Sequence, residues 1–200
     1  MKVKICGLRR PADVECINSN LPDYAGFILA PGRRRTVTKG TARELKGELD
    51  RRVHAVGVFV DAPIAEPLVY FQEGIIDVIQ LHGHEPPDYI RELKRMCDAP
   101  VIRAFVIQGE GDLKAAASSP ADILLLDGGR GDGRTFDWAM LSDFPRPYLL
   151  AGGLSPANVE DAIATCHPWG VDVSSGVETD GFKDPEKVRR FVELCRNSEA

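Results

Sequence analysis

Residues 2–7 read Lys-Val-Lys-Ile-Cys-Gly, a short strand-like run that ends on a cysteine and a glycine. Further runs of this kind follow along the chain, each rich in Val, Ile and Leu and nearly continuous rather than alternating. Continuous apolar runs of this length are typical of strands that are covered on both faces, as in parallel sheets. The expected strands are residues 3–6, 24–29, 54–60, 78–81, 101–106, 123–126, 148–151 and 170–173.

Amphipathic stretches separate the runs and predict helices, with Thr38, Ser155 and Asp184 as expected N-caps. The expected helices are residues 11–18, 38–49, 63–73, 87–96, 112–117, 138–142, 156–165 and 185–195. Strand and helix alternate with about 25 residues to a unit, which predicts an α/β fold, a single-domain (β/α)8 TIM barrel of minimal size over residues 1–200. A doubly wound open sheet is the structural alternative, but such sheets seldom need this many strands at this length.

Composition narrows the class of protein. The net charge is -5, and the longest basic run is residues 33–35, so no nucleic-acid partner is expected. No apolar run approaches the ~18 residues of a membrane span, and no targeting segment is expected at the start. The 5 cysteines match no metal-binding spacing. They are expected to be reduced thiols in a cytoplasmic protein that has no metal site.

Two side chains at expected strand ends are candidates for acid–base chemistry. Cys6 ends the first run, where a parallel α/β fold places its chemistry, but a small buried hydrophobe is an equally good interpretation. Asp127 follows four aliphatic residues and precedes Gly128 and Gly129. An apolar rim disfavours the charged form of a carboxylate, which suits a general acid, whereas a turn aspartate is the alternative. The loop over residues 128–136 is expected to close over a ligand, with a surface loop as the alternative.

Glycine-rich segments follow the last two expected strands, at residues 151–158 and 171–178. Glycines let backbone N–H groups approach an anion, and the loops after strands seven and eight hold a phosphate in many barrels. These segments therefore predict a phosphate site. Their candidate residues for ligand binding are Gly152, Gly153, Asp172, Ser174, Ser175 and Gly176.

Two further motifs offer groups for a substrate. One of Arg33, Arg34 and Arg35 could pair with a substrate carboxylate, although a solvated basic loop is the alternative. His82 ends the fourth run, and it either binds substrate directly or supports a neighbouring group.

Taken together, these segments resemble the phosphoribosylanthranilate isomerase family of tryptophan biosynthesis. The opening cysteine motif and the Gln-Leu-His-Gly run distinguish that family from sister phosphate-binding barrels. The matching segments run in order through the whole chain: residues 4–7, 25–28, Arg35, 56–60, 80–83, 126–127, 135–138, 151–154 and 172–178.

The resemblance implies an Amadori rearrangement of a small phosphorylated substrate without a cofactor. At the matching positions it makes Asp127 the general acid that protonates the ring oxygen and Cys6 the general base that removes the C2 proton. Arg35 would hold the anthranilate carboxylate, with Arg34 next by register. A monomer or a homodimer is expected. The alternatives are a sister sugar-phosphate isomerase, which would carry an aspartate at position 6, and a binding barrel without activity.

Overall fold

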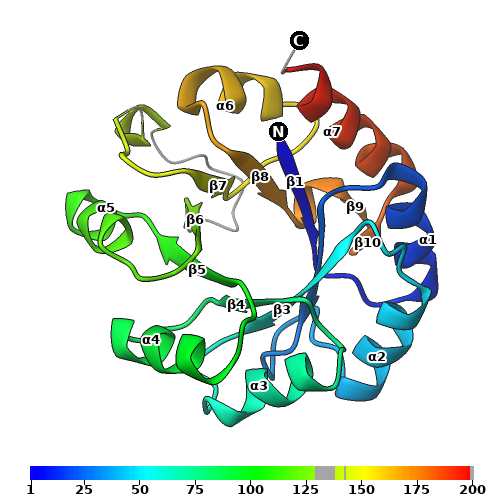
Figure 1. The fold of residues 1–200 in the computed structure, drawn as a ribbon. Helices are drawn as coiled ribbons and strands as arrows, with labels where there is room; N and C mark the ends of the chain where they lie inside the picture. The colour runs from blue at the N-terminus through cyan, green and yellow to red at the C-terminus, as the bar shows by residue number, and fades with distance from the viewer. Residues whose placement is uncertain (129–137, 142, 199–200) are drawn as a thin grey trace.

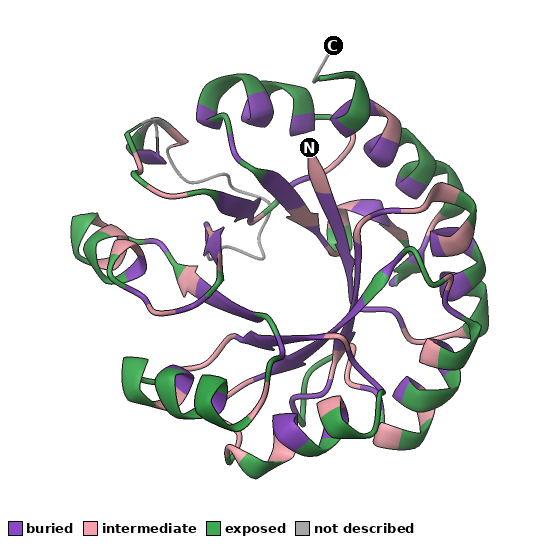
Figure 2. Cartoon of the chain, in the orientation of Figure 1, coloured by how far each residue is buried: buried purple, intermediate pink, exposed green. Residues whose placement is uncertain are grey.

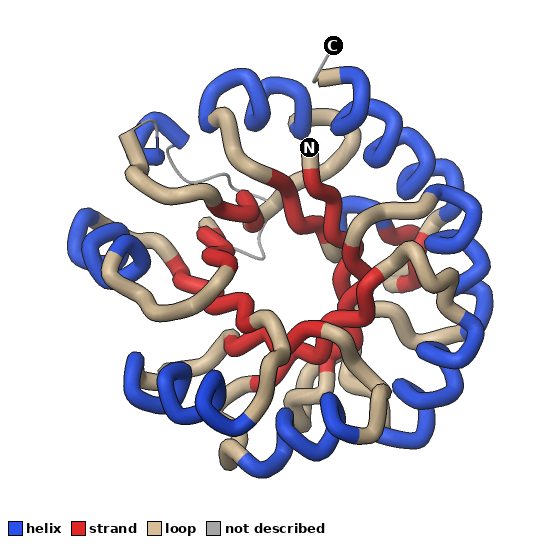
Figure 3. Tube along the Cα trace, in the orientation of Figure 1, coloured by secondary structure: helices blue, strands red, loops and turns tan. Residues whose placement is uncertain are grey.

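The computed structural model describes residues 1–128, 138–141 and 143–198. Its strands form a closed barrel in which every neighbouring pair is parallel and β8 returns to pair with β1. In Figures 1 and 3 the strands make the inner ring and the helices lie outside it. The strands are β1 (Lys2–Cys6), β2 (Tyr24–Ile28), β3 (His54–Phe59), β4 (Val78–Leu81), β5 (Val101–Val106), β6 (Ile123–Asp127), β7 (Tyr148–Ala151) and β8 (Gly170–Val173). The barrel prediction is therefore confirmed.

The helices that cover the barrel place most of their exposed residues on the outer side, whereas the strands are largely buried (Figure 2). They are α1 (Pro11–Asn20), α2 (Lys39–Glu48), α3 (Ala65–Gln72), α4 (Pro87–Met96), α5 (Glu110–Ala117), α6 (Val159–Cys166) and α7 (Pro185–Asn197), with short 3-10 helices η1 (Trp138–Leu141) and η2 (Ser175–Val177). None of the helices within the described residues is long and apolar enough to cross a membrane.

Two apolar clusters follow from the alternation of side chains along each strand. The larger cluster joins the outward residues of the strands, such as Ile5 and Phe27, to the helices. The smaller cluster contains Val78, Leu125 and Leu149 and fills the inside of the barrel. Side chains two residues further along the same strands also point inward, now at the carboxyl end, and this geometry positions the functional site.

Some expected boundaries were wrong. Helix α6 begins at Val159 rather than at residue 156, and Ser155 is not its N-cap. Asn158 occupies the cap position, and its side-chain oxygen accepts a hydrogen bond from Ser155 N, so residues 155–158 form a turn before the helix. Thr38 and Asp184 do cap their helices, since each side chain accepts hydrogen bonds from backbone N–H groups of the first turn.

Other differences concern short elements. The expected helix over residues 138–142 is the 3-10 helix η1, and residue 142 lies outside the described part of the chain. A two-stranded hairpin, β9 (Glu178–Thr179) with β10 (Phe182–Lys183), stands between β8 and α7 and was not expected. The loop predicted to close over a ligand lies outside the described residues from 129 onward.

Candidate active site

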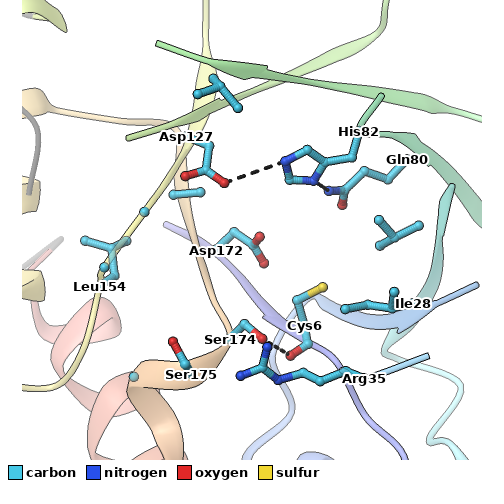
Figure 4. Close-up of a pocket in the computed structure, with 16 residues that line it drawn as sticks. Cys6, Ile28, Arg35, Gln80, His82, Asp127, Leu154, Asp172, Ser174 and Ser175 are labelled. Carbon is cyan, nitrogen blue, oxygen red and sulfur yellow. Dashed lines mark hydrogen bonds and ion pairs between the residues drawn. The ribbon is translucent and has the colours of Figure 1, made fainter. Parts of the chain in front are cut away.

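A cavity of about 410 Å³ opens at the carboxyl ends of the barrel strands. Apart from Arg33 and Arg34, every residue singled out from the sequence as catalytic or ligand-binding lines it, although these residues come from six different strand ends and the loops that follow them (Figure 4). They are Cys6, Arg35, His82, Asp127, Gly152, Gly153, Asp172, Ser174, Ser175 and Gly176. The barrel thus brings one thiol, two carboxylates and the glycine loops to one site.

Cys6 is the last residue of β1 and is only 7% exposed. Gly26 pairs with it on β2, and a Cβ atom at that glycine would lie 2.7 Å from the Cys6 Sγ, so the glycine makes room for the thiol. The Ser174 hydroxyl donates a hydrogen bond to the Cys6 carbonyl oxygen over 2.9 Å. Burial raises the pKa of the Cys6 thiol, while the neighbouring Lys4 ammonium acts to lower it.

Lys4 is completely buried inside the barrel, two residues before Cys6 and on the same face of β1. Its Nζ lies 2.9 Å from Asp172 Oδ1, across the β1–β8 pairing that sets these two residues side by side. Burial acts to lower the pKa of Lys4, but the Asp172 carboxylate and Cys6 outweigh it and the pKa is raised. Lys4 was not predicted as a site residue. The sequence could have indicated it, because residues 4 and 6 of one strand point to the same face.

Asp127 and His82 lie on the opposite side of the cavity from Cys6, with Asp172 between them in Figure 4. Asp127 ends β6, and His82 directly follows β4. The His82 Nε2 lies 3.6 Å from Asp127 Oδ2. Burial lowers the pKa of His82, so the imidazole is neutral near pH 7. An acid candidate and a base candidate therefore face one another across the same space.

The loops after β7 and β8 present backbone rather than charged side chains. Gly152 and Gly153 have φ values of +100° and +68°, a conformation that favours glycine. Backbone N–H groups in turns of this kind can bind an anion. Gly176 lies in η2, and a Cβ atom there would stand 1.8 Å from the Leu154 carbonyl oxygen. The two loops are therefore packed against each other closely enough that only glycine fits at position 176.

Arg35 belongs to a hydrogen-bond network that the sequence analysis did not predict. Its Nε and Nη2 each donate to the Glu178 carboxylate over 2.7 Å. Glu178 also accepts a hydrogen bond of 2.9 Å from Lys183, which is 5% exposed and also donates to the Ser174 carbonyl oxygen. Arg35 is thus held rigidly at the edge of the cavity, with Cys6 on the same side.

Arg33 and Arg34 do not line this cavity; both are exposed and border an adjacent pocket with Arg35. The remaining cysteines lie away from the site. Cys16, Cys166 and Cys195 are buried in helices, and Cys97 follows α4 as its C-cap residue, so it is not itself helical. All the cysteines are free thiols.

Comparisons with known proteins identify the family to which this chain is similar. The family model described as N-(5'phosphoribosyl)anthranilate (PRA) isomerase matches residues 3–194. An N-(5'-phosphoribosyl)anthranilate isomerase of Lactiplantibacillus plantarum is 46% identical over 98% of this chain and 93% of its own length. The phosphoribosyl anthranilate isomerase of Thermus thermophilus superposes with a TM-score of 0.88 at 38% identity, over 98% of this chain and 99% of that one.

A second solved structure has the same TM-score of 0.88 at 33% identity, again over 98% of this chain and 99% of the other. That structure is a phosphoribosyl anthranilate isomerase in complex with reduced 1-(o-carboxyphenylamino)-1-deoxyribulose 5-phosphate. The match covers nearly the whole length of both chains, at an identity well above the level at which only a fold is shared. This chain therefore belongs to the N-(5'-phosphoribosyl)anthranilate isomerase family.

Proposed function

We propose that this chain converts N-(5'-phosphoribosyl)anthranilate to 1-(2-carboxyphenylamino)-1-deoxyribulose 5-phosphate in tryptophan biosynthesis, with Cys6 as general base and Asp127 as general acid. The observation that carries the assignment of roles is the position of these two groups on facing sides of one cavity. An acid and a base in different environments can hold different protonation states at the same pH.

The reaction has two proton transfers. Asp127 gives its proton to the furanose ring oxygen, the C1–O bond breaks, and the nitrogen lone pair forms an iminium. The Cys6 thiolate then removes the proton from C2, and the C–H electrons form the C1=C2 bond of an enolamine. Tautomerisation of this enol places a proton on C1 and gives the ketone at C2. The nitrogen of the substrate accepts the electrons, so the chain needs no other electron sink.

The substrate's two anionic groups would bind to two different sets of donors around the cavity. The phosphate would bind to backbone N–H groups around Gly152, Gly153, Ser175 and Gly176. The anthranilate carboxylate would bind to the Arg35 guanidinium, which Glu178 orients through two hydrogen bonds. The sugar would then lie between Cys6 and Asp127, with His82, Asp172 and Ser174 around it.

Lys4 would supply the charge that the Cys6 thiolate requires. A thiol in an apolar site resists ionisation, and an adjacent ammonium stabilises the thiolate. Lys4 is fully buried and is paired with Asp172, so its position is fixed beside the base. Lys4 does not touch the reacting atoms in this account and is a positioning residue.

The test is a fluorescence assay with phosphoribosylanthranilate made in situ. The wild-type chain should remove the anthranilate-type emission rapidly, and Cys6→Ala and Asp127→Asn should each lose turnover by roughly 10²–10⁴-fold. Cys97→Ala is the matched control, because it removes a thiol outside the cavity and should keep full activity. Circular dichroism must report an intact fold for each variant.

Substantial activity in Cys6→Ala or Asp127→Asn would reject the assignment of that residue. If the wild type left the emission unchanged but still bound a phosphorylated ligand, the substrate would instead be another sugar phosphate. We also propose that the chain works in the cytoplasm as a monomer or a homodimer. Size-exclusion chromatography with light scattering would decide between the two.

A further inference from the structure

Gln80 has a buried amide side chain on the inner face of β4, and it has no part in the proton transfers or in the binding of the two anionic groups. It is 1% exposed and lines the same cavity as Cys6 and Asp127. Its Nε2 lies 3.3 Å from the His82 Nδ1. Its Oε1 is buried and has no hydrogen-bond partner among the residues that the structure describes. A buried acceptor without a donor is unfavourable and rare in native proteins, so this carboxamide calls for an explanation.

The contact with His82 selects one form of the imidazole ring. An amide nitrogen can only donate, so the His82 Nδ1 must accept from Gln80 Nε2. Because burial keeps the imidazole neutral, its single N–H is then on Nε2. That N–H faces Asp127 Oδ2 across 3.6 Å, and a dashed line joins the two residues in Figure 4. Such contacts are often long without ligand and shorten when substrate binds.

We propose that Gln80 is a positioning residue for the isomerisation: it holds His82 as the Nε2–H tautomer, which donates to the Asp127 carboxylate, and its Oε1 accepts a hydrogen bond from a sugar hydroxyl of the substrate. The inference rests on the proposed role of Asp127 as the general acid. When Asp127 passes its proton to the ring oxygen it becomes negatively charged. A donor already aimed at it then makes a charge-assisted hydrogen bond, which is stronger than a neutral one.

The orientation of Oε1 favours a ligand over a packing role. In Figure 4 this oxygen points away from His82 and toward the space between Asp172 and Cys6, where the sugar would lie. If Gln80 only filled the barrel, an apolar side chain of similar size would fill it better, because the unpaired oxygen would disappear. The proposal therefore predicts that Gln80→Met is at least as thermostable as the wild type and yet has a lower kcat.

The first readout is the tautomer itself. In ¹⁵N-correlated NMR spectra the wild-type His82 should show the Nε2–H form near neutral pH, with the signal assigned by its absence in His82→Asn. Gln80→Met should give a mixture of tautomers or the Nδ1–H form. Gln80→Glu keeps the shape but offers Nδ1 a carboxylate acceptor, so it should favour a proton on Nδ1.

The second readout is kinetic. Gln80→Met should lower kcat by roughly 10- to 100-fold, the range expected for one hydrogen bond to a charged group. In the His82→Asn background the same change should cost less, because only the hydrogen bond to the sugar hydroxyl is then left to lose. An unchanged tautomer in Gln80→Met, or equal losses in the presence and absence of His82, would overturn the proposal. Full activity in Asp127→Asn would instead reject Asp127 as the general acid, and a wild type that leaves the emission unchanged would reject the proposed function. The NMR result on the tautomer would stand in either case.

Discussion

Adding one methyl group at Gly152 should disable the enzyme by moving Asp127. A Cβ atom at this position would lie 2.5 Å from Gly128 N and 2.9 Å from Asp127 Oδ1. Ordinary non-bonded contacts need about 3.5 Å, so these atoms must separate by up to roughly 1 Å. A misplacement of about 1 Å in a reacting group can cost on the order of 10²-fold in rate. We therefore expect Gly152→Ala to lower kcat by about 10²-fold.

The φ of Gly152 is +100°, so alanine there also introduces backbone strain of roughly 1–2 kcal/mol. Gly74→Ala separates the two effects, because Gly74 has a φ of +67° and a Cβ there would meet nothing within 4 Å. Gly74→Ala should lower the free energy of unfolding by a similar amount and keep kcat. The fluorescence assay gives kcat and KM, and denaturant unfolding gives stability. A Gly152→Ala enzyme with wild-type kcat would refute the placement of the acid.

Two further substitutions test the charged groups. Lys4→Met removes the cation beside Cys6, so the pKa of the thiol rises and the ascending limb of kcat/KM should move to higher pH. Lys2→Met is the control, because Lys2 lies at the amino end of β1 and pairs with Asp23, away from the cavity. It should leave the profile in place, and an unmoved profile in both variants would reject the role of Lys4. Arg35→Lys cannot reproduce the paired bonds to Glu178 and should raise KM by roughly 10- to 100-fold with little change in kcat. That KM penalty should vanish for a substrate analogue without the ring carboxylate, and its persistence there would mean that Arg35 does not bind this group.

The strands and the location of the site could be predicted because local sequence determines them. The run over residues 123–126 is aliphatic throughout, and β6 is observed at Ile123–Asp127. Since all strands of the barrel are parallel, residues at their carboxyl ends must meet at one end of the barrel. The order of the strands was therefore enough to predict that Cys6, Asp127 and the glycine loops lie close together, without knowledge of individual contacts.

The interactions that tune the site could not be predicted in this way, because they join residues that are distant in sequence. Arg35 and Glu178 are 143 residues apart, and their pairing depends on the hairpin after β8, whose two-residue strands carry no apolar pattern. From sequence alone Lys4 is expected to be an exposed strand residue. It is buried because β8 pairs with β1 and sets Asp172 beside it. The orientation of the Gln80 amide likewise depends on His82 and on the shape of the cavity.

The central claim is that Cys6 removes the C2 proton, and substrate deuterated at C2 of the ribose tests it most directly. In single-turnover reactions the wild-type enzyme should remove the deuterium with a primary isotope effect. Cys6→Ala should leave it at C2 and form no ketone, although the protein remains folded and still binds the phosphorylated substrate. Removal of the deuterium by Cys6→Ala at a rate near that of the wild type would contradict the account.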